Sequence, residues 1–204
     1  MLRAAIELVL VENPVRRRFL RTTMDWFFAA AGRPALGRVL EVGSGNGDGI
    51  EAIERRFRPG AIHGLDVDPA QIERAKKRLH GKRNGSPAPE LWVGDAARLP
   101  FPDASYDALF QFNCLHHVAT WETALDEVRR VLKPGGLYFY EVLSREYFER
   151  LWLLGRLLQR NVLAPGRTVF GWGEFDAALE ARGFRTLASR SRRVPGWHDG
   201  VARR

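Results

Sequence analysis

The stretch VLEVGSGNGDG at residues 39–49 constrains the fold of this chain more than any other feature. A short apolar run leads directly into glycines at positions 43, 45, 47 and 49, and a helical pattern follows over residues 47–57. Glycine lets the backbone approach a ligand closely and adopt positive φ angles. A strand that enters such a loop and continues into a helix is typical of a site for a nucleotide-like cofactor. The stretch therefore predicts an α/β fold with a cofactor loop after its first strand.

The spacing of these glycines argues against a diphosphate ligand. The dinucleotide fingerprint Gly-x-Gly-x-x-Gly would need a glycine at position 48, which is Asp48. A register that begins at Gly45 would need another at position 50, which is Ile50. The Gly-Lys-Ser/Thr of a phosphate-binding P-loop is absent as well. The loop is thus suited to a nucleoside and poorly built for a pyrophosphate.

Short apolar runs bounded by Gly, Pro or Asp alternate with helical patterns along the chain. The expected strands cover residues 38–42, 61–66, 90–93, 105–112 and 136–142, with expected helices over 47–57, 69–80 and 121–132. Further helices are expected over 2–11, from Pro14 to about Ala31, over 145–160 and near 173–182, and two final strands near 184–189 and 197–203. This alternation predicts parallel strands with right-handed crossovers and helices on both faces of the sheet.

Asp66 ends the second expected strand, 19 residues after Gly47. That is close to the spacing of about 20 residues at which an acid meets ribose hydroxyls in nucleotide-binding folds. A carboxylate can accept both hydroxyl protons, which explains the residue type. Capping of the helix that opens at Pro69 is the other role for an aspartate here, and Asp68 suits that role better.

Five motifs follow one another over residues 36–142. They are Glu41-x-Gly43-x-Gly45-x-Gly47, GLDVDP at 64–69, Gly94-Asp95-Ala96-Ala97, the run from SYDAL at 105–109 to LHHV at 115–118, and VLKPGG at 131–136. In this order and spacing the chain resembles the class I S-adenosylmethionine (SAM)-dependent methyltransferases, in the group that includes the ubiquinone/menaquinone-biosynthesis methyltransferases. With the alternation of elements, we expect a Rossmann-like, doubly wound α/β sheet of seven strands, mostly parallel with one antiparallel C-terminal strand, plus N-terminal helices.

The resemblance implies SAM as the cofactor and assigns roles to the motif residues. Glu41 would lie near the cationic ammonium group of SAM, and the backbone at Gly43, Ser44 and Gly45 would border its methionine portion. In the family, the aspartate equivalent to Asp95 accepts a hydrogen bond from the adenine amino group. The remaining residues that we expect to bind the cofactor are Gly47, Asp66, Val67, Ala96 and Gln111.

His116 and His117 follow the fourth expected strand, at the edge where ligands meet open α/β sheets. Because the sulfonium of SAM is already an activated electrophile, the protein mainly has to align the acceptor with it. A hydroxyl or phenol acceptor would benefit from a general base, which either histidine could supply at neutral pH. The alternative is that the pair packs and hydrogen-bonds beside the cofactor. Gln111 and Asn113 also fall near the methyl group by position.

The segments outside the cofactor half bear on the methyl acceptor. Residues 2–31 and 145–160 combine arginines with aromatic and aliphatic residues, so they either cover an apolar pocket or lie at a membrane surface. We therefore expect methyl transfer to an N, O or C nucleophile of a hydrophobic small molecule or membrane lipid. RNA is the alternative partner, because residues 1–38 carry a net charge of +4 and residues 182–204 a net charge of +6. A SAM-binding protein without catalytic activity is the third hypothesis.

Size and composition bound the remaining expectations. The 204 residues suffice for one domain, divided into an N-terminal helical cap (1–35), a SAM-binding core (36–142) and a substrate-side part with the last strands (143–204). Cys114 is the only cysteine, which excludes internal disulfides and a multi-cysteine metal site, so we expect no metal. No apolar stretch reaches the roughly 18 residues of a membrane span, and the N-terminus lacks a signal-peptide layout. The expected location is the cytoplasm, with peripheral contact at the inner membrane surface left open.

Overall fold

The strands form one seven-stranded sheet. The computed structural model describes residues 14–80, 87–143, 170–191 and 197–204, and the strand order is β3-β2-β1-β4-β5-β7-β6. The strands are β1 (Arg38–Val42), β2 (Ala61–Asp66), β3 (Glu90–Val93), β4 (Tyr106–Phe112), β5 (Leu132–Leu143), β6 (Arg185–Ser191) and β7 (Trp197–Arg203). All neighbours from β3 to β5 pair in parallel, whereas β7 is antiparallel to both β5 and β6. The predicted sheet, with its one antiparallel C-terminal strand, is confirmed.

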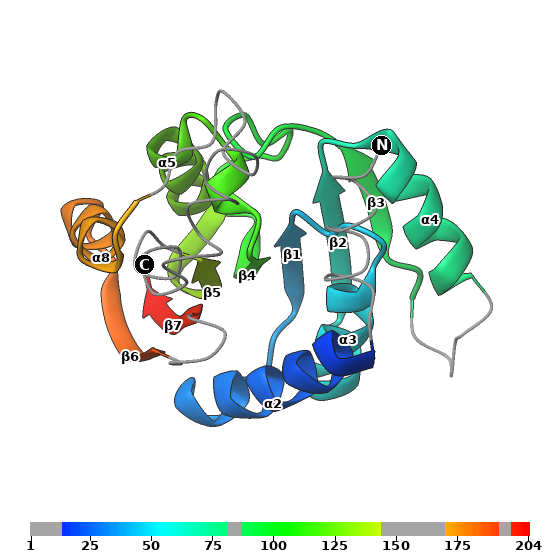
Figure 1. The fold of residues 1–204 in the computed structure, drawn as a ribbon, viewed down its shortest axis with the longest axis horizontal. Coiled ribbons are helices and arrows are strands. Elements are labelled where there is room, and N and C mark those ends of the chain that lie inside the picture. The colour runs from blue at the N-terminus through cyan, green and yellow to red at the C-terminus, as the bar shows by residue number, and fades with distance from the viewer. Residues whose placement is uncertain (1–13, 81–86, 144–169, 192–196) are drawn as a thin grey trace, which may run out of the picture.

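Helices cover both faces of this sheet (Figure 1). They are α2 (Pro14–Ala30), α3 (Asp48–Phe57), α4 (Pro69–Leu79), the short 3-10 helix η1 (Leu115–His117), α5 (Trp121–Val131) and α8 (Trp172–Ala181). Buried side chains of α2, α3 and α4 share one apolar cluster, and those of α5 and α8 share the cluster on the opposite face. The helices expected over 2–11 and 145–160 lie outside the described residues. Among the described residues, no helix combines the length and the apolar character needed to cross a bilayer.

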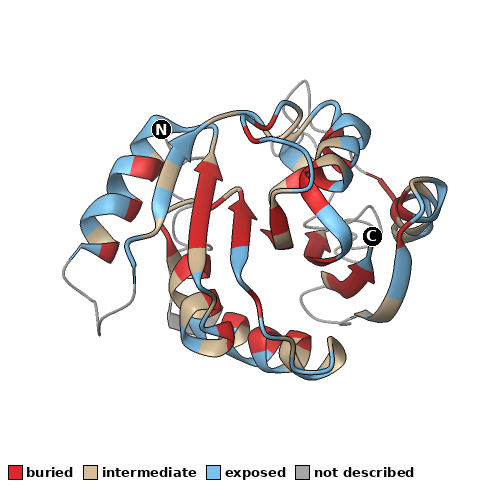
Figure 2. Ribbon diagram, turned by 180° about the vertical axis from the view of Figure 1, so that it is seen from behind, coloured by how far each residue is buried: buried red, intermediate tan, exposed pale blue. Residues whose placement is uncertain are grey.

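The aromatic residues of α2 belong to the core. Met24 and Phe27 are buried, and the ring of Phe27 lies 5.4 Å from that of Phe139 in β5. Arginines 17, 18 and 21 are exposed on the other side of the helix, and the contrast between the two sides is visible in Figure 2. The sequence left a core position and a membrane surface open for this helix. The packing assigns its apolar side to the core.

The centre of that core is a cluster of phenylalanine rings. Phe110 in β4 stacks on Phe139 in β5 with 4.4 Å between ring centroids, and Phe57 at the end of α3 meets both at 5.1 and 5.2 Å. Aromatic pairs at these separations add to the free energy gained from burial alone. The rings therefore connect α2 and α3 to the middle of the sheet.

Strand β5 begins earlier than the sequence suggests. The expected strand starts at position 136, after Lys133-Pro134-Gly135-Gly136, but Leu132 already pairs with Tyr106. The register then shifts, so that Ala108 pairs with Leu137. The N–H of Ser105 donates to the carbonyl of Val131 at 2.8 Å and brings the segments that enter β4 and β5 together at this point. The turn residues are thus an irregularity inside the strand pairing and do not precede it.

Candidate functional site

The glycine loop joins the carboxyl end of β1 to the first turn of α3. Gly43, Gly45 and Gly47 all have positive φ, at 74°, 50° and 84°. The N–H groups of Gly43 and Ser44 both donate to the carbonyl of Leu65 in β2, at 2.8 and 3.0 Å. Left-handed backbone of this kind is costly for residues with a side chain. The loop therefore turns sharply over the end of β2, as its glycines predict.

Each glycine of the loop meets different surroundings. A Cβ atom on Gly43 would lie 2.4 Å from Cβ of Cys114, and one on Gly49 would lie 1.8 Å from Oε1 of Glu41. A Cβ on Gly47 would come within 3.0 Å of Leu79. At Gly45, by contrast, a Cβ would meet nothing within 4 Å. Protein atoms thus explain three of the glycines, and only at Gly45 does the backbone border open space.

Glu41 is a buried acid directly beneath this loop. Its exposed fraction is 2%, and among the described residues its Oε2 atom has no hydrogen-bond partner. Burial raises the pKa of Glu41 well above its ordinary value, and the negative charges of Asp66 and Asp48 raise it further, against the lowering effect of Arg16. A cation placed beside this carboxylate would restore its ionised form.

Asp66 braces the loop from the end of β2. Its Oδ2 accepts the N–H of Gly45 at 2.8 Å, and its Oδ1 accepts the N–H of Asp68 at 2.9 Å. A carboxylate has about four acceptor positions, so two remain. The side chain of Asp68 accepts the N–H of Ala70 at 2.8 Å and caps α4. Asp68 thus takes the capping role that the sequence favoured for it.

The end of β3 lies beside Asp66. The N–H of Gly94 donates to the backbone carbonyl of Asp66 at 3.0 Å, which brings Asp95 and Ala96 to the same edge. Oδ1 of Asp95 accepts the N–H of Ala97 at 2.9 Å. Val67 is 72% exposed, so its aliphatic side chain is accessible to a ligand. This edge therefore offers carboxylates and an exposed apolar surface next to one another.

The turn after β4 carries the two histidines. Gln111 is buried, and its amide lies 2.8 Å from the hydroxyl of Tyr138 and 3.2 Å from the N–H groups of Cys114 and Leu115. The amide oxygen satisfies both N–H groups when the amide nitrogen donates to Tyr138. Gln111 thus supports the start of η1 with its own side chain. The rings of His116 and His117 lie 4.0 Å apart, the first half-buried and the second exposed.

Cys114 connects this turn to the glycine loop. Its Sγ donates to the carbonyl of Val42 at 3.3 Å, and its Cβ fills the space that a side chain at position 43 would need. Burial raises the pKa of this thiol to about 12. The contact places η1 next to the loop, so the predicted site residues of β1, β2, β3 and β4 share one edge of the sheet.

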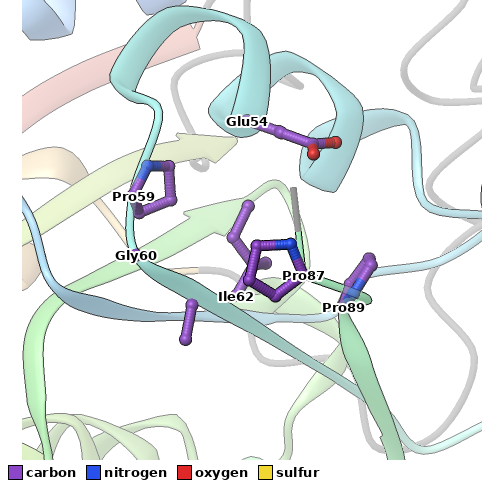
Figure 3. Close-up of a pocket in the computed structure, with 7 residues that line it drawn as sticks. Glu54, Pro59, Gly60, Ile62, Pro87 and Pro89 are labelled. Carbon is purple, nitrogen blue, oxygen red and sulfur yellow. The ribbon is translucent and has the colours of Figure 1, made fainter. Parts of the chain in front are cut away.

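Two hollows lie at the opposite edge of the sheet. One, of about 10 Å³, lies between the end of α3 and the prolines Pro59, Pro87 and Pro89 (Figure 3), and it holds about one water molecule. A wider groove of about 550 Å³ opens beside Lys133 and Gly136, where β4 and β5 begin. Their position separates both hollows from the glycine loop.

Sequence reasoning missed two features of the site. Gly49 is needed because Glu41 packs against it, and the two positions meet only in the folded chain. Arg16, Asn113 and the buried Glu141 form a network beside η1. Glu141 is the single acid in the apolar run of β5, just as Glu41 is in β1, and that similarity is the signal that could have identified it.

Comparison with known proteins agrees with this geometry. Residues 40–140 match the family described as "Methyltransferase domain". This region belongs to the methyltransferase domain family. A SAM-dependent methyltransferase from Methanosarcina mazei has the same fold, with a TM-score of 0.68 at 20% identity over 84% of this chain and 93% of that one. The prediction of a class I SAM-dependent methyltransferase domain is confirmed, and the cofactor of this domain is SAM.

Two curated relatives are similar over about half of the chain. A fatty-acid O-methyltransferase of Mycolicibacterium smegmatis is 39% identical over 103 residues, which make up 50% of this chain and 36% of that protein. A phthiotriol/phenolphthiotriol dimycocerosates methyltransferase of Mycobacterium leprae is 38% identical over 103 residues, with the same two shares. The chain thus matches about a third of the length of these relatives.

The residues present fit SAM. A cationic ammonium needs an acid that is not already neutralised, and Glu41 has a buried oxygen without a partner among the described residues. A ligand that approaches the backbone closely needs open space, which Gly45 borders. A purine ring needs an apolar surface beside the ribose, and Val67 is exposed next to Asp66.

Proposed function

We propose that this methyltransferase transfers the methyl group of SAM to an oxygen atom of a lipid or another hydrophobic molecule. The observation that carries the proposal is the buried oxygen of Glu41, which has no partner among the described residues, in the same glycine-rich motif of a methyltransferase domain as the open backbone of Gly45. The acceptor class is supported by the two relatives, one of which is named for fatty acids and O-methylation and the other for phthiotriol and phenolphthiotriol dimycocerosates.

Eight of the ten residues predicted to bind the cofactor then have a direct role, whereas Gly47 shapes the loop and Gln111 supports the start of η1. Glu41 pairs with the ammonium of SAM, and the loop backbone from Gly43 to Gly45 borders the methionine portion. Asp66 accepts the ribose hydroxyls with its two remaining acceptor positions. Asp95 accepts the adenine amino group, while Val67 and Ala96 contact the faces of the purine. These residues all fall within 36–142, which we propose as the SAM-binding core.

The chain's part in the reaction is alignment and removal of a proton. SAM supplies an activated methyl group, so an O–CH₃ bond forms as the S–CH₃ bond breaks, and S-adenosylhomocysteine leaves. A carboxylate acceptor is already ionised at neutral pH and releases no proton. A hydroxyl acceptor does release one, and His116 or His117 is the base that we propose to receive it. The identity of the acceptor thus decides whether the histidines are needed.

Methyl-labelled SAM tests this function directly. The chain should be incubated with labelled SAM and, separately, with a long-chain fatty acid, a lipid extract rich in hydroxylated lipids, and total RNA. We expect label in the lipid samples, and much less when Glu41→Gln replaces the native protein at a SAM concentration near the native Kd. Label in RNA alone would support RNA modification instead. SAM binding by calorimetry without transfer to any sample would support a SAM-binding protein without catalytic activity.

Replacement of Asp66 tests the ribose contact. We expect Asp66→Ala to weaken SAM binding by about 1–3 kcal/mol, the cost of losing hydrogen bonds to a charged group. The loss has two sources, since the ribose acceptors disappear and the N–H of Gly45 loses its brace. Titration calorimetry measures it, with Asp68→Asn as the control because that variant keeps the cap of α4. Unchanged affinity in Asp66→Ala would remove Asp66 from the site.

A further inference from the structure

Two fully buried acids lie opposite each other on the last paired strands. Glu141 in β5 pairs with Asp199 in β7, and each has an exposed fraction of 0%. Like charges in this arrangement repel, and buried charges are costly unless they are paired. Two arginines supply the pairing: Arg16 contacts Glu141 at 2.8 Å, and Arg190 contacts Asp199 at 2.9 Å. We call these four residues the charge cluster.

The arginines of the charge cluster connect α2 with β6 and β7. The guanidinium of Arg16, which belongs to α2, lies 4.8 Å from the ring centroid of Trp197 in β7. In the reverse direction, the guanidinium of Arg190 in β6 lies 4.2 Å from the ring of Trp26 in α2. Both contacts are within cation–π range. The cluster therefore has a fixed position relative to α2, β6 and β7.

Glu141 also holds the turn that follows β4. Its Oε1 accepts from Nδ2 of Asn113 at 2.5 Å, and its backbone carbonyl accepts the N–H of Asn113 at 2.7 Å. Asn113 has a φ of 51°, in the left-handed region that asparagine tolerates better than most residues. Two bonds from one residue thus stabilise a backbone conformation that would otherwise be unfavourable.

That conformation sets the direction of the chain into η1. The next residue is Cys114, which packs against Gly43 of the cofactor loop. His116 and His117 follow within the same short helix. A change at Asn113 would therefore move the histidines relative to the cofactor loop, while the loop itself is held separately through Leu65 and Asp66.

We propose that Glu141 is a positioning residue for methyl transfer, acting through Asn113 on η1, with Arg16 as its counter-charge. This role rests on the proposed function, because it assumes that transfer takes place between the cofactor loop and η1. A buried ion pair by itself stabilises a fold weakly and is often replaceable by apolar residues. Its two contacts with the one left-handed residue before η1 point to positioning.

Steady-state kinetics separate positioning from stability. We expect Glu141→Gln and Asn113→Gly to lower kcat for labelled methyl transfer by about 10–100-fold, because small misplacements near reacting groups have effects of that size. The Kd for SAM should stay within about threefold of the native value, since the cofactor loop is held separately. Asp199→Asn is the matched control, because it removes the other buried acid and leaves the contacts between Glu141 and Asn113 in place. It should lower Tm and keep kcat.

Asn113→Gly carries the test where Glu141→Gln does not fold, because it leaves the ion pair between Arg16 and Glu141 intact. It removes the side-chain bond to Glu141 and lets the backbone at position 113 leave the left-handed conformation. A native kcat in Asn113→Gly, or an equal loss of kcat in Asp199→Asn, would overturn the positioning role.

A second readout does not depend on the acceptor. The imidazole C–H resonances of His116 and His117, assigned through His116→Gln and His117→Gln, should shift in Asn113→Gly and stay in place in Asp199→Asn. Unshifted resonances in Asn113→Gly would overturn the inference. If the native protein labels no acceptor while these resonances shift as expected, the proposed function fails and the control of η1 by Glu141 holds.

Discussion

Glu41→Gln should weaken SAM binding by about 30–300-fold at pH near 8, or roughly 2–3.5 kcal/mol, which is typical for loss of one partner of a buried charge pair. The side chain is buried beneath the cofactor loop, so its attraction to an ammonium is little screened by water. Glutamine keeps the size of the side chain and its contact with Gly49, so the substitution removes mainly the charge. Calorimetric titration with SAM measures the difference. Glu122→Gln, at an exposed position in the first turn of α5, is the control and should bind as the native chain does.

The difference in SAM affinity between the native chain and Glu41→Gln should depend on pH. Burial and the neighbouring acids raise the pKa of Glu41 in the ligand-free protein, so a cationic ligand that favours the carboxylate must displace a proton. The affinity of the native chain for SAM should therefore rise with pH up to the raised pKa, and the gap to Glu41→Gln should widen in parallel. Titrations in two buffers of different ionisation enthalpy count the proton. Release of no proton, or uptake of one, would contradict the assignment.

The same shift has a defined sign for stability. A carboxyl whose pKa is raised in the folded state binds more protons there than in the unfolded state. Its contribution to the free energy of unfolding is therefore fully present below the ordinary pKa of glutamate and declines as pH rises through the raised pKa. SAM should therefore stabilise the protein most at pH values near the raised pKa of Glu41, where the protonated carboxyl no longer contributes to the free energy of unfolding of the protein without SAM.

Phe139→Ala should lower the free energy of unfolding by about 3–5 kcal/mol, the range for removal of a fully buried aromatic side chain. Phe139 has an exposed fraction of 0% and contacts rings from α2, α3 and β4. Removal of its ring leaves a cavity at the point where two helices meet the sheet. Urea denaturation followed by circular dichroism measures the loss. Val93→Ala, at a position in the edge strand β3 that is 54% exposed, is the control and should cost less than about 1 kcal/mol. Equal losses in the two variants would show that the phenylalanine cluster is not the centre of the core.

Local patterns in the sequence were enough to predict much of this fold. The predicted bounds of β1, β2 and β3 agree with the structure because each strand is a short apolar run that stops before a glycine, in β1 and β3, or at an aspartate, in β2. Helix α4 was likewise marked by Asp68 and Pro69 at its start. Patterns of this kind involve residues close together in the chain, so they can be recognised without knowledge of the tertiary structure.

Contacts between distant residues could not be predicted in the same way. Asn113 and Glu141 are 28 positions apart, and nothing in the local pattern of either residue indicates the other. The reason for Gly49 is similar, since the space that it leaves is filled by a side chain from β1. The position of α2 was undecided for a related reason, because an apolar helix face can pack against a protein core or a lipid surface equally well. Only the packing of Phe27 on β5 distinguishes the two.

The brace between Asp66 and Gly45 has a consequence for the thermodynamics of ligand entry. The turn is held by this bond and by the two N–H groups that donate to the carbonyl of Leu65, and all three bonds are made within the protein itself. A nucleoside that arrives at Gly45 meets a preorganised receptor, so little conformational entropy of the main chain is lost on association. Recognition at this turn is therefore closer to the docking of rigid partners than to folding around a ligand.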